Sequence, residues 1–151
     1  LSTASYSLPV TYDLRFRSPS YTANQIIFSH GPTLTVLGVG NTAIYYSHNV
    51  ATRGSTRPFS TNAWVHAIIA VQTNNIATVY FDGVEATYIT PNYYGSPAPL
   101  LTIGRRNESS PLWFSGNVAE FRIWDGWQTN RAHGATATNT LTGTEPGLIG
   151  Y

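Results

Sequence analysis

The sequence of 151 residues has no cysteine and no methionine, and only 10% of its residues are charged. Without cysteine it forms no disulfide and no thiolate metal site, so the redox state of its compartment is left open. All eight basic residues are arginines, scattered along a chain of formal net charge +1. Nucleic acids need a dense basic patch and membrane surfaces a basic amphipathic helix. We therefore expect neither nucleic acid nor membrane as a partner.

Long apolar runs are also missing. No run approaches the ~20 residues that cross a bilayer, and the opening LSTASYS lacks the basic and apolar regions of a signal peptide. The chain starts at Leu1 without an initiator Met, which suggests a processed piece or one excised from a longer chain. A chain of this length fits one domain, and we expect residues 1–151 to form a single unit.

What the sequence does contain is typical of an all-β protein. Thr, Ser, Asn, Gly and Tyr are abundant, and short apolar runs are broken by Pro and Gly. The same mixture is common in secreted proteins, so we expect a secreted, extracellular location.

The stretch from Trp64 to Ile89 carries the clearest strand signal. Two apolar runs are separated by a polar cluster and then by Asp82-Gly83, a dipeptide that suits a tight hairpin corner. Alternation places Trp64, His66, Ile68 and Ala70 on one face and Val65, Ala67, Ile69 and Val71 on the other. Both faces are largely apolar, which predicts a central position in a sandwich.

Further strands are predicted before and after this meander. In residues 6–17 Tyr12, Leu14 and Phe16 alternate with Asp13, Arg15 and Arg17, which predicts a half-buried strand with a charged outer face. Other predicted strands cover residues 25–29, 33–39, 43–47, 100–104, 116–124 and 148–151. Residues 48–61 are interpreted as a surface loop or irregular edge strand, 90–99 as a loop, and 125–140 as at best a short helix. These ten to twelve strands select a two-sheet sandwich or a barrel.

Three pieces of the chain together resemble one family. They are WVHAIIAVQTNNIATVYFDGVEA, LLTIGRRNESSPLWFSGNVAEFRIWD and LTGTEPGLIGY. In this order they resemble the laminin-G-like and pentraxin-like domains of the concanavalin A-like lectin and glucanase superfamily. The resemblance implies an all-β, antiparallel two-sheet jelly-roll sandwich of concanavalin A-like type.

The same resemblance bears on cofactors and packing. Family members that hold calcium usually have an acidic residue before the Glu of the "x-E-hydrophobic-R" strand, but here that residue is Ala119. We therefore expect no cofactor, and a calcium ion of the family type is the alternative. The family fills the positions of Trp64 and Trp124 with core aromatics, so both are predicted to be buried. His66 is interpreted as a hydrogen-bonded structural residue, and Glu120 and Arg122 as a local ion pair.

A catalytic constellation is not evident. Retaining glycosidases need two carboxylates about 5 Å apart, and the glucanases of this superfamily carry them as E-x-D-x-x-E. This chain has Glu120 and then Asp125, so the glucanase pattern is absent. No Ser-His-Asp grouping or His-rich metal spacing replaces it. We predict that the protein is not an enzyme.

Aromatic and polar residues in loops and at strand ends are the candidate ligand-binding set. A sugar ring has an apolar face ringed by hydroxyls, which suits a flat aromatic side chain flanked by fixed donors and acceptors. The alternative is that these rings cover the ends of the core. The candidates are Tyr45, Tyr46, His48, Asn49, Arg53, Tyr93, Tyr94, Arg105, Trp113 and Trp127.

Three functions remain open at this point. The first is a non-catalytic, lectin-like module that binds a glycan or glycoprotein. The second is a structural or adhesive module of an extracellular assembly or repeat array, which binds protein partners or itself, because weakly charged surfaces self-associate readily. The third, a glycoside hydrolase, is disfavoured by the missing acid pair. Asn107-Glu108-Ser109 also matches an N-glycosylation acceptor pattern.

Overall fold

The computed structural model describes residues 9–20, 25–30, 35–39, 44–48, 51–54, 60–73, 76–89, 101–105, 112–129 and 146–150. Within these ranges the regular structure is β-strand. A search of them for long apolar helices that could cross a membrane finds none. Asn49, Tyr93, Tyr94 and Asn107 lie outside the described residues, as do the predicted loop at 90–99 and most of the predicted helix at 125–140.

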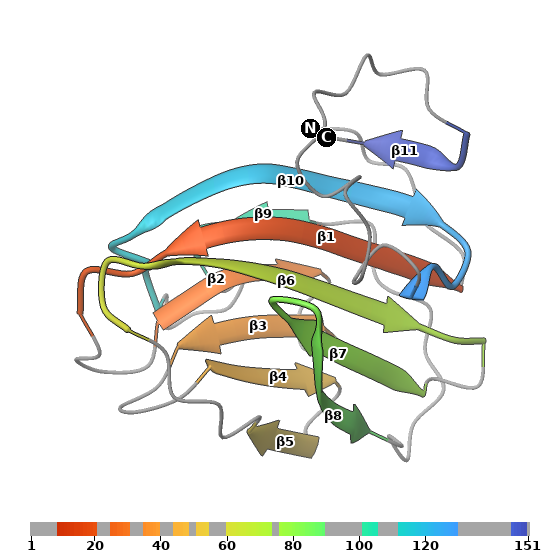
Figure 1. Ribbon diagram of the computed structural model, residues 1–151, viewed down its shortest axis with the longest axis horizontal. Coiled ribbons are helices and arrows are strands. Elements are labelled where there is room, and N and C mark those ends of the chain that lie inside the picture. The colour runs from red at the N-terminus through yellow and green to blue at the C-terminus, as the bar shows by residue number, and fades with distance from the viewer. Residues whose placement is uncertain are drawn as a thin grey trace.

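The described strands form two sheets, and all neighbouring strands are antiparallel (Figure 1). In spatial order the six-stranded sheet contains β11 (Leu148–Gly150), β10 (Asn117–Asp125), β1 (Val10–Arg17), β6 (Trp64–Val71), β7 (Ala77–Phe81) and β8 (Val84–Ile89). The five-stranded sheet contains β5 (Ala51–Gly54), β4 (Ile44–His48), β3 (Thr35–Val39), β2 (Gln25–His30) and β9 (Leu101–Ile103). The predicted all-β, two-sheet antiparallel sandwich is confirmed.

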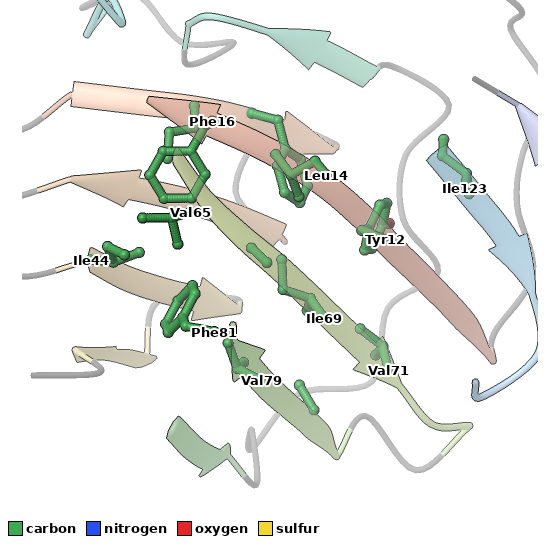
Figure 2. Packing of buried hydrophobic residues seen from close by; sticks show 14 of the residues in the cluster. Tyr12, Leu14, Phe16, Ile44, Val65, Ile69, Val71, Val79, Phe81 and Ile123 are labelled. Atoms are coloured by element: carbon green, nitrogen blue, oxygen red, sulfur yellow. The ribbon is translucent and has the colours of Figure 1, made fainter. Parts of the chain in front are cut away.

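The hydrophobic core lies between the two sheets. Tyr12, Leu14 and Phe16 of β1 are fully buried there, as the alternation predicts, and Figure 2 shows them on the same side as Val65, Ile69 and Val71 of β6. Phe28 of β2 packs against both Tyr12 and Phe121, with ring centroids 5.0 and 5.2 Å apart. The two halves of the chain therefore share one core.

The outer face of the six-stranded sheet is buried as well along part of its length. Ile68, Ala70 and Trp124 on this face are at most 1% exposed. Residues 126–129 bend back toward it, because the backbone N–H of Gln128 donates to Oγ1 of Thr11, which itself donates to the carbonyl of Gly126. The prediction that both faces of β6 are covered is confirmed for its C-terminal half.

A β-bulge in β10 sets which side chains reach the core. Asp13 pairs with Arg122 and Arg15 with Ala119, so β10 has one residue more than β1 in this interval. Glu120 occupies the extra position with φ of 56°. Because of the bulge, both Val118 and Phe121 pack against the core although they are three residues apart.

Several boundary predictions are settled by the sheet order. Residues 51–54 form the edge strand β5, which is the second of the two alternatives predicted for residues 48–61, and residues 148–150 form the edge strand β11. The Asp82-Gly83 turn is confirmed, with positive φ at both residues (49° and 79°). The meander is central only in part, because β6 and β7 lie inside the sheet whereas β8 is its edge.

Candidate functional site

Two tryptophans and two arginines gather at one end of the sandwich. We call Arg17, Trp64, Arg105, Trp113 and Asn117 the Arg–Trp end. In Figure 1 this is the end at which β1 finishes and β6 and β10 begin. Arg17 is the last residue of β1 and lies between Trp64 and Asn117, the first residues of its two neighbouring strands.

Arg105 and Trp113, two of the predicted ligand-binding residues, form a stacked pair. They follow β9 and precede β10, and an isolated antiparallel bridge joins their backbones. The guanidinium carbon of Arg105 lies 5.7 Å from the centroid of the Trp113 ring, within cation–π range. Trp113 is 61% exposed. The pair therefore presents a large aromatic surface with donors beside it.

Trp64 forms a second pair of the same kind, and the prediction that it belongs to the core is wrong. Its side chain is 47% exposed, and the guanidinium carbon of Arg17 lies 5.3 Å from its ring centroid. Nη2 of Arg17 donates to Oδ1 of Asn117 at 3.0 Å. The physical reason is register: Trp64 lies opposite Arg17 on the charged outer face, beyond the covered part of the sheet. Trp124, by contrast, is buried as predicted.

Residues 112–116 connect the two pairs and are anchored to both sheets. The Phe114 ring packs edge-on against Phe16 with centroids 6.3 Å apart, and the backbone N–H and hydroxyl of Ser115 both donate to Oε1 of Gln25. Gly116 leaves no room for a side chain, because an added Cβ would lie 2.1 Å from the Arg17 carbonyl oxygen. Trp113 and Asn117 are four residues apart, so their Cα atoms are at most about 14 Å apart.

Trp127 lies at the opposite end of the sandwich. It follows Asp125, which pairs with Val10 at the start of β1, whereas Asn117 pairs with Arg17 at the end of β1. The length of β10 separates these positions by roughly 25 Å. Trp127 is 47% exposed, as expected for a surface residue. One small ligand does not reach both ends.

The remaining predicted residues with a described backbone lie on the five-stranded sheet. In the register of β4 and β5, Tyr45 lies opposite Gly54, Tyr46 opposite Arg53 and His48 opposite Ala51. The sheet order places β4 three strand spacings from β9, which is roughly 14 Å. The sheet thus brings Tyr46 and Arg53 together and leaves them separate from Arg105.

A network of charged side chains occupies the outer face of the six-stranded sheet next to Arg17. Asp13 is 2% exposed, and its carboxylate contacts Nε2 of His66 at 2.9 Å and Nη1 of Arg122 at 3.4 Å. Nη2 of Arg122 donates to Oε2 of Glu120 at 3.1 Å, and Nε of Arg15 lies 3.7 Å from the same oxygen. The predicted Glu120–Arg122 pair is confirmed, and so is the prediction that His66 is hydrogen-bonded.

This network is poorly suited to acid–base catalysis. A general acid or base must reach a substrate proton, but Asp13 is buried and held by both His66 and Arg122. The Glu120 carboxylate is paired with two guanidinium groups, those of Arg15 and Arg122.

The calcium site of the resembling family does not fit the residues around Glu120. Ala119 supplies no side-chain oxygen, and the Glu120 carboxylate already faces Arg15 and Arg122. Two cations beside the one carboxylate oppose a divalent ion. A search for three or more His, Asp or Glu side chains that could share a metal ion finds no such group among the described ranges.

Two other titratable groups are perturbed, and both lie away from the Arg–Trp end. Burial lowers the pKa of His30 from 6.5 to about 4. Burial and the neighbouring Glu85 raise the pKa of Tyr80 above its usual value of 10.0. Both side chains are therefore neutral at pH 7 and serve the packing.

The described strands form a two-sheet antiparallel β-sandwich with exposed tryptophans at one end. A family model described as the concanavalin A-like lectin/glucanases superfamily, of laminin-G type, matches residues 2–131. The chain therefore belongs to this superfamily, as its motifs predict. No curated protein matches the chain in sequence.

Solved structures with the same fold include several binding domains. A Bacteroides ovatus protein, provisionally described as carbohydrate-binding, superposes with a TM-score of 0.75 at 17% identity over 92% of this chain and 43% of its own. Domain 4 of the extracellular GH43 arabinanase AbnA from Geobacillus stearothermophilus, in complex with arabinotriose, superposes with a TM-score of 0.65 at 18% identity. The match covers 86% of this chain and 67% of that domain's chain. The heptameric SAP-like pentraxin of Limulus polyphemus superposes with a TM-score of 0.65 at 11% identity, over 82% of this chain and 67% of its own. The chain thus spans less than half of the Bacteroides protein, and such identities show the fold alone.

Proposed function

We propose that the protein is a non-catalytic, lectin-like module that binds a glycan or glycoprotein at the Arg–Trp end. The observation that carries this proposal is the Arg105–Trp113 pair, in which an aromatic ring exposed to 61% lies under a guanidinium group. An exposed tryptophan beside an arginine offers a partner a flat apolar surface with hydrogen-bond donors next to it. A sugar ring matches it, because C–H groups stack on the indole while hydroxyls accept from Arg105.

The comparisons support this function at the level of class. The superfamily contains lectins, and structural neighbours are described as carbohydrate-binding or were solved with an oligosaccharide. The superfamily also contains glucanases. We favour binding without catalysis because Asp13 and Glu120, the carboxylates of the charged network, are held by cations.

Titration calorimetry with neutral and acidic oligosaccharides, after a glycan array, tests the proposal. We expect Trp113→Ala to weaken binding about tenfold or more, because a central aromatic contact is worth at least 1.4 kcal/mol. Val84→Ala is the matched control, since Val84 is also 61% exposed but lies on the edge strand β8. Absence of binding to every sugar class would refute the function.

A structural or adhesive module is the second candidate. The observation that favours it is that Trp64 and Trp113, both exposed, lie at one end of the molecule, as in a surface that meets another protein. A structural neighbour is a heptamer. On this alternative the same tryptophans contact a protein partner or a second copy, and sugars leave the interaction unchanged.

We also propose that the protein works outside the cell. Its scarcity of charge and abundance of Thr, Ser and Asn support this location, as does a fold shared with a domain of an extracellular enzyme. Immunodetection of the parent protein in culture medium and washed cells checks it, and recovery from the cytosol alone would contradict it.

A further inference from the structure

The arginines of this protein differ in whether a carboxylate neutralises them. Arg15 lies 3.7 Å from a Glu120 oxygen, and Arg122 contacts both Asp13 and Glu120. Arg17 and Arg105 have no such ion pair with any carboxylate in the described ranges; each is stacked on an exposed tryptophan. Among the arginines whose side chains the structure describes, the two without a described carboxylate partner therefore lie at the same end of the sandwich.

This arrangement does more than a neutral sugar requires. Hydroxyl groups are bound well by amides and neutral donors, whereas a guanidinium group presents a planar fork that matches a carboxylate or sulfate. Each guanidinium carbon lies over an indole ring, 5.3 Å from its centroid for Arg17 and 5.7 Å for Arg105, and each group carries several N–H donors. Arg17 donates one of these to Asn117, whose side chain fixes it beside Trp64. The fork is thus held in place before a ligand arrives.

We propose that the Arg–Trp end binds an anionic saccharide, with Arg17, Trp64 and Asn117 forming a subsite of their own. Trp64 stacks on the apolar face of a sugar ring, and Arg17 binds the carboxylate or sulfate that the ring carries. Arg105 and Trp113 hold a further ring in the same way. This proposal rests on the proposed glycan-binding function and narrows it to acidic sugars.

The test compares ligands that differ only in charge. The whole chain is titrated at low salt with oligogalacturonate, with its methyl ester and with chondroitin sulfate oligosaccharides, and poly-glutamate serves as an anion without sugar rings. We expect the free acid to bind about tenfold or more tightly than the ester, because a hydrogen bond to a charged group is worth about 1.5–3 kcal/mol. The preference should shrink as salt is raised. The two acidic saccharides distinguish a carboxylate from a sulfate source.

Single substitutions test whether the preference for the free acid over the ester arises at the subsite of Arg17, Trp64 and Asn117. Arg17→Gln should abolish most of the difference between acid and ester, and Arg17→Lys should keep part of it because the charge remains without the planar fork. Trp64→Ala should weaken both ligands, and Val84→Ala should change neither. Thermal melting of each variant checks that the fold is intact, and Arg105→Gln provides a second charge deletion if Arg17→Gln fails to fold.

The outcomes separate this proposal from the function on which it rests. Equal binding of acid and ester overturns the anionic proposal and leaves the glycan-binding function in place. Equal binding of poly-glutamate also overturns it, because the surface then selects charge alone. Absence of binding to every saccharide overturns both. A charge preference that survives in both Arg17→Gln and Arg105→Gln shows that the acidic group is bound elsewhere.

Discussion

At the scale of single residues, some charged side chains of this protein are buried in ion pairs, whereas others are at least partly exposed at the Arg–Trp end. Asp13 is nearly fully buried and has two partners, the His66 ring and the Arg122 guanidinium. Removing one partner of such a pair would leave a buried charge, at a cost of several kcal/mol. These residues are therefore committed to structure. Arg17 and Arg105 make no comparable contact among the described carboxylates and remain available for a ligand.

His30 makes the stability of the folded protein depend on pH. It is fully buried at the end of β2, where Nδ1 shares a hydrogen bond with the hydroxyl of Tyr12 and the two rings meet edge-on. Burial lowers its pKa from 6.5 to about 4. The folded state therefore binds its proton less readily than the unfolded chain. Stability from this residue is complete above pH 6.5 and is lost as the pH falls from 6.5 towards 4.

We predict that the free energy of unfolding falls by about 3 kcal/mol between pH 7 and 4 because of His30. Urea unfolding at a series of pH values measures it, and His30→Gln should flatten the curve between pH 6.5 and 5, above the range of ordinary carboxylates. If that variant does not fold, NMR titration of the His30 ring in the native protein decides the question. Protonation near pH 6.5 without unfolding would refute the prediction.

At the scale of elements, the bulge in β10 reconciles its sequence with the sheet. Strict alternation from Val118 would direct residues 120 and 122 inward and Phe121 and Ile123 outward. The extra residue at Glu120 reverses the order after it, so Phe121 packs against Phe28 and Ile123 is buried. Glu120 and Arg122 are then both on the outer side and form their ion pair.

The positive φ of Glu120 leads to a testable difference between two deletions of the same carboxylate. Both Glu120→Ala and Glu120→Gly lose the contacts with Arg15 and Arg122, but only glycine adopts a φ of 56° without strain. We expect the glycine variant to be more stable than the alanine variant by about 1 kcal/mol, in contrast to the usual order within strands. Denaturant midpoints of the two proteins measure this. A less stable glycine variant would show that the bulge is not maintained in solution.

At the scale of the whole molecule, the sandwich separates its three exposed tryptophans, Trp64, Trp113 and Trp127, into two regions. The Arg–Trp end carries Trp64 and Trp113, and the opposite end carries Trp127, roughly 25 Å away along β10. A site that includes all the predicted residues is therefore too large for one short ligand. The strands β4 and β5, with Tyr46 opposite Arg53, lie across the five-stranded sheet and could contribute only to a long chain.

We predict that the protein is a monomer of about 16.5 kDa whose mass is unchanged by sugar. This follows if the exposed tryptophans bind glycan rather than a second copy. Light scattering coupled to gel filtration, with and without oligosaccharide, measures it. A stable oligomer that ignores sugars and dissociates in Trp113→Ala would favour the assembly function instead.

The sequence by itself determined the strands, the class of fold and the family. Alternation in β1 and β6, the Asp82-Gly83 turn and the motif order are local features, and the structure and the family match bear them out. Arg105 and Trp113 were also selected from the sequence as candidate ligand-binding residues, because their residue types lie in a polar, turn-rich stretch. Both residues are exposed in the structure.

Only the tertiary structure decided which aromatic side chains are available to a partner. Trp64 and Trp124 have the same strand context in the sequence, yet one is 47% exposed and the other 1%. The difference arises because residues 126–129 bend back toward the sheet beside Trp124, whereas Trp64 lies at its far end opposite Arg17. Strand register and chain crossings depend on the whole fold, so alternation alone could not reveal them.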